Sequence, residues 1–318
     1  MTTQTSRRGV DLCAPVAAMI AAAALTFGVG PAMAQTATAA TAAPAPAARA
    51  DGDGPALWAV RDEDSVIYLF GTVHMLKPGT AWGSDKVDAA LEASDQVWFE
   101  VTNPEDQAAI APLVQQYGIS PDKPLSSWLT PEEQTMLARA VAEIGLSPAQ
   151  IDPARPWFAA IMLGTGPYIA AGFDTSLSVE LNLRDRALAA GKSIHGFETV
   201  DQQIGGLARM SDATQMEYLR RFLGRHETAA AELDRTVAGW IAGDVTVLDQ
   251  FARENGRDIA EEVHQVFLAQ RNADWTDQIE TLLDGSGVAF VAVGAAHLAG
   301  DDSLQDLLTA RGHAVTRE

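Results

Sequence analysis

Two segments of this 318-residue chain end in the same pattern, an apolar run followed by Gly-x-x-His. The first leads through Gly71 to His74, and the second leads through Gly294 to His297. Because β-branched and aromatic residues precede each glycine, both histidines are expected just beyond the end of a strand. Neutral imidazoles at such positions are suited to bind a divalent metal ion or to transfer protons.

Two glutamates occupy matching positions at the ends of two further predicted strands. Glu100 follows Phe99, and Glu198 follows Phe197. In open α/β sheets the ligand crevice lies beyond the carboxyl ends of the strands, where a glycine lets the backbone turn sharply. Two imidazoles with one or two carboxylates then form a divalent-metal site with room for water and substrate. The chain order His, Glu, Glu, His suggests two halves that face each other.

The alternative is that these residues carry no chemistry, with each histidine in an ordinary turn and each glutamate capping a helix. That account requires four polar residues to reach four corresponding strand ends by coincidence. The other histidines are weaker candidates. The segment that starts at His226 resembles the start of a zinc-protease helix, but it has Ala230 at the position of the second histidine. We expect His264 to have a surface role, on the same helix face as Arg271. His195 is expected to point away from Glu198, and His313 to be exposed.

Strands and helices alternate along the chain. Strands are predicted over 66–70, 95–101, 192–197, 288–293 and 314–316. The strand at 288–293 is apolar throughout, which is typical of a central strand buried on both faces. Strands therefore gather near both ends of the folded part. This pattern predicts an α/β fold with a central mixed sheet built from the N- and C-terminal halves and a largely helical insertion or cap between them.

Capping residues and apolar spacing mark the helices. Ser84 caps a predicted helix, and Thr130 with Pro131 begins another in a capping-box pattern. A further helix is expected from Asp174 to Gly191, with an apolar stripe formed by Leu177, Leu181 and Leu188. Residues 200–285 are predicted to be almost entirely helical. Their clearest apolar face comprises Ile259, Val263, Val266 and Phe267.

The first 34 residues have the features of a signal for export of the protein. Arg7 and Arg8 precede an apolar run over 14–30 and a small-x-small site at 32–34, so residues 1–34 are expected to be a signal peptide. The alternative is a membrane anchor, for which a run of about 17 residues is short. Residues 35–54 are rich in Ala, Pro and Thr and are predicted to form a disordered tether before a domain over 55–318. A periplasmic or secreted protein with no membrane span after cleavage is expected, by the Sec or the twin-arginine route.

Charge and cysteine content narrow the chemistry. The formal charge is −20, from 22 Lys and Arg against 42 Asp and Glu, which argues against a nucleic-acid partner. The single cysteine, Cys13, lies in the predicted signal peptide. The mature chain would therefore have no disulfide and no thiolate nucleophile, so that catalysis would depend on oxygen and nitrogen groups.

From about Trp58 to Arg317 the sequence resembles the TraB/GumN family, which is related to the Tiki membrane-associated metalloproteases. The resemblance rests on the two Gly-x-x-His segments, the two Phe-Glu pairs, Gly191-Lys192-Ser193-Ile194 and Arg271-Asn272. It implies a divalent-metal hydrolase, with peptide cleavage in some relatives. By position, His74 and His297 match the motif histidines, and Glu100 and Glu198 the acidic partners. The resemblance also puts Arg271 near the site, where it would bind a substrate carboxylate or stabilise an oxyanion; pairing with a helix carboxylate is the alternative.

These observations lead to the hypothesis of a secreted, metal-dependent hydrolase of peptides or another small-molecule substrate. Mn, Co, Zn or Fe would be bound by His74, His297 and Glu198, with Glu100 as the general base; the reverse roles of the two glutamates stay open. Two alternatives remain. One is a protein that binds a metal or haem without catalysis. The other is an ester hydrolase that uses His74 and a glutamate without metal. The sequence does not predict the oligomeric state.

Overall fold

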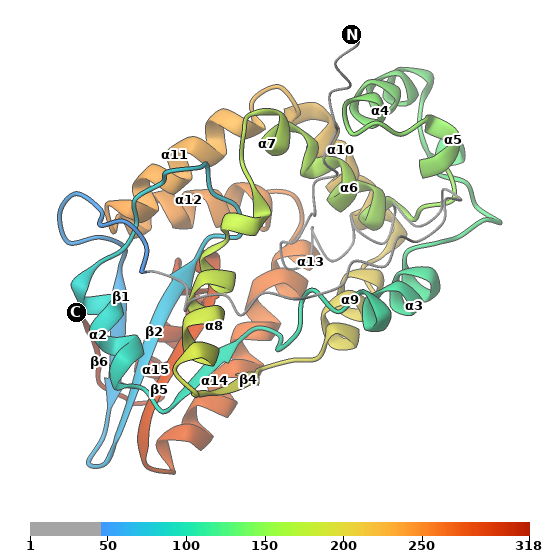
Figure 1. The fold of residues 1–318 in the computed structure, drawn as a ribbon. Coiled ribbons are helices and arrows are strands. Elements are labelled where there is room, and N and C mark those ends of the chain that lie inside the picture. Colours follow the sequence, from blue (N-terminus) through green and yellow to red (C-terminus); the bar gives the residue numbers. More distant parts are fainter. Residues whose placement is uncertain (1–45) are drawn as a thin grey trace, which may run out of the picture.

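A computed structural model describes residues 46–318, which form one six-stranded mixed sheet covered by helices (Figure 1). The strand order is β4-β3-β5-β2-β1-β6. The strands are β1 (Leu57–Arg61), β2 (Ser65–Thr72), β3 (Gln96–Phe99), β4 (Ser193–Gly196), β5 (Gly287–Gly294) and β6 (Val315–Arg317). Neighbours among β4, β3, β5 and β2 are parallel, whereas β1 pairs antiparallel with β2 and β6. The predicted mixed α/β fold is confirmed.

All five predicted strands are present, each within two residues of its expected bounds at either end. The sequence analysis missed β1, which forms a hairpin with β2. Asp62 closes the connecting turn, because its carboxylate accepts hydrogen bonds from the backbone N–H groups of Asp64 and Ser65. The run Leu57–Val60 is wholly buried and directly follows an alanine-rich segment, so no alternation of polar and apolar residues marks it.

Helices cover both faces of the sheet. On one face, α2 (Asp85–Ala93) and α8 (Val179–Ala189) pack through Val87, Leu91 and Leu183 against strand residues such as Phe70 and Phe290. On the other face, α14 (Gln270–Leu283) and α15 (Leu304–Ala310) pack through a cluster that includes Trp275, Ile279 and Leu308. Strand β5 lies between these layers with its side chains from Ala289 onward buried, as expected for a central parallel strand.

The remaining helices form the insertion that was predicted between the strands (Figure 1). They are α3 (Gln107–Tyr117), α4 (Pro131–Glu143), α5 (Pro148–Ile151), α6 (Pro156–Gly164), α7 (Gly166–Ala170), α9 (Val200–Ala208), α10 (Asp212–Arg225), α11 (Ala229–Ile241), α12 (Val245–Asn255) and α13 (Glu261–His264). A separate apolar core centred on α6 holds much of this insertion together. Helix α11 ties it to the sheet, since the Trp240 indole N–H donates to the Gly71 carbonyl at 2.7 Å.

The predicted helix starts at Ser84 and Thr130 are confirmed by side-chain caps, and Thr130 forms a full capping box. The stripe predicted for the segment before Gly191 is wrong in two positions. Leu177 and Leu188 are 39% and 52% exposed. Asp174 caps only a short 3-10 turn, and α8 begins afresh after Ser178, so the helical phase differs from a single helix.

The N-terminal predictions lie largely outside the described residues. The signal peptide and the tether up to residue 45 cannot be compared with the structure. Residues 46–54, however, contact the domain: Arg49 pairs with Asp85 and Asp88, and the backbone at Ala48 and Ala50 bonds to Gly83. The ordered part therefore begins before residue 55. Within 46–318 no helix is long and apolar enough to cross a membrane.

Candidate active site

The four predicted residues come together at one edge of the sheet. Glu198, Glu100, His297 and His74 follow β4, β3, β5 and β2, which are neighbours in this order and are parallel. The carboxyl ends of parallel strands meet at one edge, so the four side chains share one region of the molecule.

His297 is buried and its tautomer is fixed from two sides. It lies in a 3-10 turn, η5 (Ala295–Leu298), and is 4% exposed. Its Nδ1 lies 2.5 Å from Oδ1 of Asn272, whose Nδ2 donates to the Asp302 carbonyl at 2.7 Å. Arg271 Nη1, which can only donate, approaches Nε2 at 3.2 Å. Nδ1 therefore carries the proton and Nε2 the lone pair. Burial and then the Arg271 charge lower the pKa of His297 to about 3, so the imidazole is neutral.

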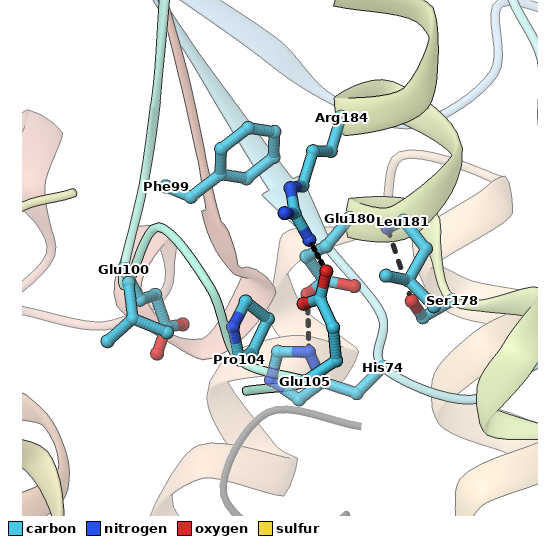
Figure 2. Close-up of a pocket in the computed structure, with 10 residues that line it drawn as sticks. His74, Phe99, Glu100, Pro104, Glu105, Ser178, Glu180, Leu181 and Arg184 are labelled. Carbon is cyan, nitrogen blue, oxygen red and sulfur yellow. Dashed lines mark hydrogen bonds and ion pairs between the residues drawn. The ribbon is translucent and has the colours of Figure 1, made fainter. Parts of the chain in front are cut away.

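His74 is held by a carboxylate from α8. Its Nδ1 contacts Glu180 Oε1, which also accepts from the Thr72 hydroxyl, and Figure 2 shows His74 below Glu180. Burial lowers the pKa of His74, but the carboxylates of Glu180 and Glu100 outweigh it, and the net shift is upward. Because Nδ1 lies against Glu180, Nε2 is the nitrogen left for a metal ion or a substrate. It lies 3.3 Å from the point where a Cβ on Gly294 would stand.

Arg271 is bonded through all five of its N–H groups. Nε donates to Glu198, and Nη2 donates to Glu100 at 2.6 Å and to Glu198 at 2.5 Å. Nη1 donates to His297 and to the Phe267 carbonyl. That carbonyl lies in a π-helical turn, η4 (Gln265–Ala269), which runs directly into α14. The guanidinium thus joins both glutamates to His297 and has no N–H left for a substrate carboxylate in this arrangement.

The two glutamates differ in their surroundings. Glu100 accepts hydrogen bonds from the Gly294 backbone N–H at 2.8 Å, from Gln203 and from Arg271. Burial raises the pKa of Glu100, but Arg271 and both histidines lower it by a larger amount. The net result is a pKa well below the usual range. Burial raises the pKa of Glu198, and repulsion from the Glu100 carboxylate raises it further. Together these two effects outweigh the lowering by Arg271, so the net shift is upward. Glu100 is therefore the more firmly ionised carboxylate.

The motif glycines serve close packing, and the backbone at neither of them is left-handed. Neither Gly71 nor Gly294 has a positive φ. A Cβ on Gly71 would stand 2.9 Å from the Ala295 backbone, and one on Gly294 would stand 3.0 Å from Glu100 Oε1. Glycine at these two positions lets the adjacent chain and the site side chains approach the ends of β2 and β5.

Two cavities meet at the site. The larger, of about 340 Å³, lies between the helical insertion and the sheet edge and has His74, Glu100, Arg271 and His297 in its wall. The smaller, of about 30 Å³, is lined by His74, Glu100 and Glu180, and an ion pair between Arg184 and Glu105 forms part of its wall (Figure 2). Glu198 lines neither of these cavities.

The other histidines lie elsewhere. His195 stacks on Trp98 with ring centroids 4.8 Å apart, and His226 and His313 contact Glu143 and Glu280. The expectation of a surface role for His264 was wrong, because His264 is 7% exposed and lies 2.6 Å from Asp302. The intervening π-helical turn also changes the helical phase between His264 and Arg271.

Three supporting residues were not predicted as part of the site. Glu180 holds His74, Asn272 holds His297, and Gln203 donates to both Glu100 and Glu198. Asn272 lies beside Arg271 in the motif, which was the one available signal. Glu180 and Gln203 lie on helices, at positions that only the packing of α8 and α9 against the sheet edge reveals.

The donor set and the charge at this edge can be compared with what a metal ion needs. Within 46–318 no group of three or more His, Asp or Glu side chains stands in position to hold a metal ion. The donor types nevertheless fit: each imidazole has a supporting side chain at Nδ1, as metal-ligating histidines do, and Nε2 of His297 becomes available once Arg271 Nη1 moves away. Glu180 Oε2 and Gln203 Oε1 are buried without a hydrogen-bond partner. Glu100 and Glu198 share the single guanidinium of Arg271, which leaves one negative charge in excess when both carboxylates are ionised.

Fold and site together define an α/β protein with a His/Glu/Arg centre at the carboxyl ends of four parallel strands. A sequence model of the TraB/PrgY/gumN family matches residues 56–317, and the chain belongs to this family. The resemblance noted from the motifs is thereby confirmed. Comparison with curated proteins found no match, and neither did comparison with solved structures.

Proposed function

We propose that the protein is a hydrolase that binds a divalent metal ion through Nε2 of His74, Nε2 of His297 and the Glu100 carboxylate. One observation carries this proposal. Both imidazoles have a supporting side chain at Nδ1, Glu180 or Asn272, which leaves Nε2 of each ring as the nitrogen for a metal ion at the cavity wall that Glu100 shares.

Glu100, rather than Glu198, is the better candidate ligand. Its Oε1 lies 3.8 Å from His297 Nε2, and the Gly294 Cβ position that it approaches at 3.0 Å is also 3.3 Å from His74 Nε2. The low pKa of Glu100 keeps it ionised, as a ligand must be. This assignment differs from the expectation from the sequence, in which Glu198 was the ligand and Glu100 the general base. Glu198 then has a positioning role, since it bonds to Arg271 and lines neither cavity.

A bound divalent ion would supply a water of lowered pKa and would polarise the carbonyl under attack. The chain supplies the rest. Arg271 holds Glu100 and Glu198 in fixed orientations, and its hydrogen bond to His297 Nε2 has to be released for that lone pair to bind a metal. The apolar wall of the larger cavity excludes water around the substrate.

A second candidate is metal-free ester hydrolysis, and the His74–Glu180 contact favours it. A carboxylate that holds Nδ1–H and raises the pKa of the imidazole prepares Nε2 to accept a proton from water or a nucleophile. In this mechanism His74 is the general base and Glu180 orients it.

The test uses protein purified without chelators and without a histidine tag. Metal-loaded and chelator-treated samples are incubated with a defined peptide mixture, which is analysed by mass spectrometry, and with p-nitrophenyl esters. Peptide cleavage that chelation abolishes and added metal restores is the expected result. Ester hydrolysis that survives chelation supports the metal-free candidate. The absence of any cleavage, with a Soret band on addition of haem, supports a non-catalytic binding protein.

A further inference from the structure

The larger cavity has a mostly apolar lining, which the proposed hydrolysis does not by itself require. Its walls away from the sheet edge are apolar and come from the helical insertion: Phe222, Leu233, Leu248, Phe251 and Phe267. A volume of about 340 Å³ is enough for an aromatic or branched aliphatic group. The cavity opens directly onto His74, Glu100 and His297.

Two phenol hydroxyls interrupt this apolar wall. The protein has four tyrosines, and two of them, Tyr168 and Tyr218, line the cavity. Tyr218 is 6% exposed, and its ring packs against Phe222 and Phe267 at 4.9 and 5.3 Å between centroids. Among residues 46–318 neither hydroxyl has a hydrogen-bond partner. Neither hydroxyl oxygen is fully shielded from solvent, so a group bound in the cavity can take the place of water at both.

Both phenols stay protonated near neutral pH. Burial, and to a lesser degree Glu232, raises the pKa of Tyr168 to about 12. Burial and the neighbouring Tyr168 raise the pKa of Tyr218. Each hydroxyl can therefore donate one hydrogen bond and accept another.

We propose that this cavity binds the substrate group next to the bond that is cleaved, and that this group is large and apolar with one hydrogen-bonding atom that meets the Tyr168 and Tyr218 hydroxyls. The proposal rests on the proposed hydrolytic function for the position of the cleaved bond. It adds the class of substrate: an aromatic or branched aliphatic body with a single amine, hydroxyl or amide.

The binding test needs no turnover. N-Phenyl-1-naphthylamine is a neutral aromatic amine whose fluorescence rises in apolar cavities, and 1-benzylnaphthalene has nearly the same shape with CH2 in place of the N–H. Tyr218→Phe keeps the ring and removes the hydroxyl, so it should weaken binding of the amine by about 2- to 10-fold and leave the hydrocarbon within about 2-fold. Tyr117→Phe is the matched control, because that hydroxyl bonds to Asp201 outside the cavity. Equal affinity of wild type and Tyr218→Phe for the amine would overturn the polar part of the proposal.

A second variant locates the probe. Phe251→Glu introduces a carboxylate into the cavity wall and should abolish binding of both probes, whereas Leu188→Glu, at a site 52% exposed on α8, should not. Phe251→Ala, with weaker binding of both probes, serves the same purpose if the glutamate variant does not fold. Undiminished binding in a folded Phe251 variant would overturn the assignment of the cavity.

Hydrolysis separates this proposal from the proposed function. Probe binding with the expected variant pattern, but no cleavage of any peptide or ester, would refute the function and leave the cavity assignment intact. Cleavage that is equally fast for alanyl and phenylalanyl substrates, and unchanged by Tyr218→Phe, would refute the substrate class and leave the function intact.

Discussion

Asn272 Oδ1 lies 2.5 Å from Nδ1 of His297, and this contact decides which nitrogen of the imidazole faces the cavity. Since Asn272 Nδ2 donates to the Asp302 carbonyl, the amide orientation is fixed and its oxygen can only accept. The buried asparagine thus acts on His297 as Glu180 acts on His74. Each histidine thus has a supporting side chain at Nδ1, an amide for His297 and a carboxylate for His74, while Nε2 of His297 alone accepts a hydrogen bond from Arg271.

Removing the acceptor at Asn272 should weaken metal binding. Asn272→Leu leaves the His297 Nδ1–H without a partner and lets the ring rotate, so metal affinity should fall by about 10- to 100-fold. Asn272→Asp keeps an acceptor for Nδ1–H and should retain affinity, even though the lost Nδ2 donor lowers stability. Competition titration with a chromogenic chelator measures the affinities. If both variants lose affinity equally, orientation of His297 is not the role of Asn272.

The two glutamates should respond differently to amide substitution. Glu100→Gln removes the charge of the proposed ligand and should lower metal affinity, with activity partly restored at high metal concentration. Glu198→Gln should keep the metal and cost about 1–3 kcal/mol of stability, because a charged partner of Arg271 is lost. Metal titration and urea unfolding measure the two effects. The opposite pattern would restore the roles expected from the sequence, with Glu198 as ligand.

His297 should make the metal-free protein sensitive to mild acid. The pKa of the folded imidazole is about 3, against about 6.5 in an unfolded chain, so between these values only the unfolded chain takes up the proton. The contribution of His297 to stability is complete above about pH 6.5 and is lost as the pH falls towards 3, at no more than about 1.4 kcal/mol per pH unit. Urea unfolding at pH 7 and pH 5 should therefore show a shallower pH dependence for His297→Gln. If the free energy of unfolding depends on pH equally in the variant and the wild type, His297 is not the source of the acid sensitivity.

A methyl group at Gly294 should disturb the site but not the sheet. In Gly294→Ala the new Cβ would stand 3.0 Å from Glu100 Oε1 and 3.3 Å from His74 Nε2. We expect at least a tenfold loss of metal affinity with an unchanged circular dichroism spectrum. Gly224→Ala, in α10 with no atom within 4 Å of its Cβ position, is the control and should stabilise the protein by about 0.5–1 kcal/mol. Full metal affinity in Gly294→Ala would show that metal binding does not depend on the close approach of Glu100 and His74 to this glycine.

The sequence predicted the four central residues because their positions depend on a simple rule. His74, Glu100, Glu198 and His297 all follow apolar runs, and parallel strands bring such positions to one edge. The supporting residues Glu180 and Gln203 could not be predicted from the sequence. They depend on how helices pack against that edge, and no local pattern distinguishes them from solvent-facing helix residues.

Local errors had equally local causes. The stripe containing Leu177 and Leu188 assumed one helix where a 3-10 turn and a new cap at Ser178 reset the phase. The motif glycines were assigned to turns alone, whereas close approach of neighbouring atoms also requires both. The surface assignment of His264 failed because its partner, Asp302, lies far away in the sequence.

The most direct test of the central claim is the metal content of the wild type and of three histidine variants, determined by mass spectrometry after purification without chelators or a histidine tag. We expect one divalent ion per chain in the wild type. His195→Ala, whose side chain stacks on Trp98 away from the site, should also retain one ion. His74→Ala and His297→Ala should each retain none, and the double variant should be no worse than either. Unchanged metal content in a folded His74→Ala or His297→Ala variant, or a wild type that binds no ion at any concentration tested, would contradict the account.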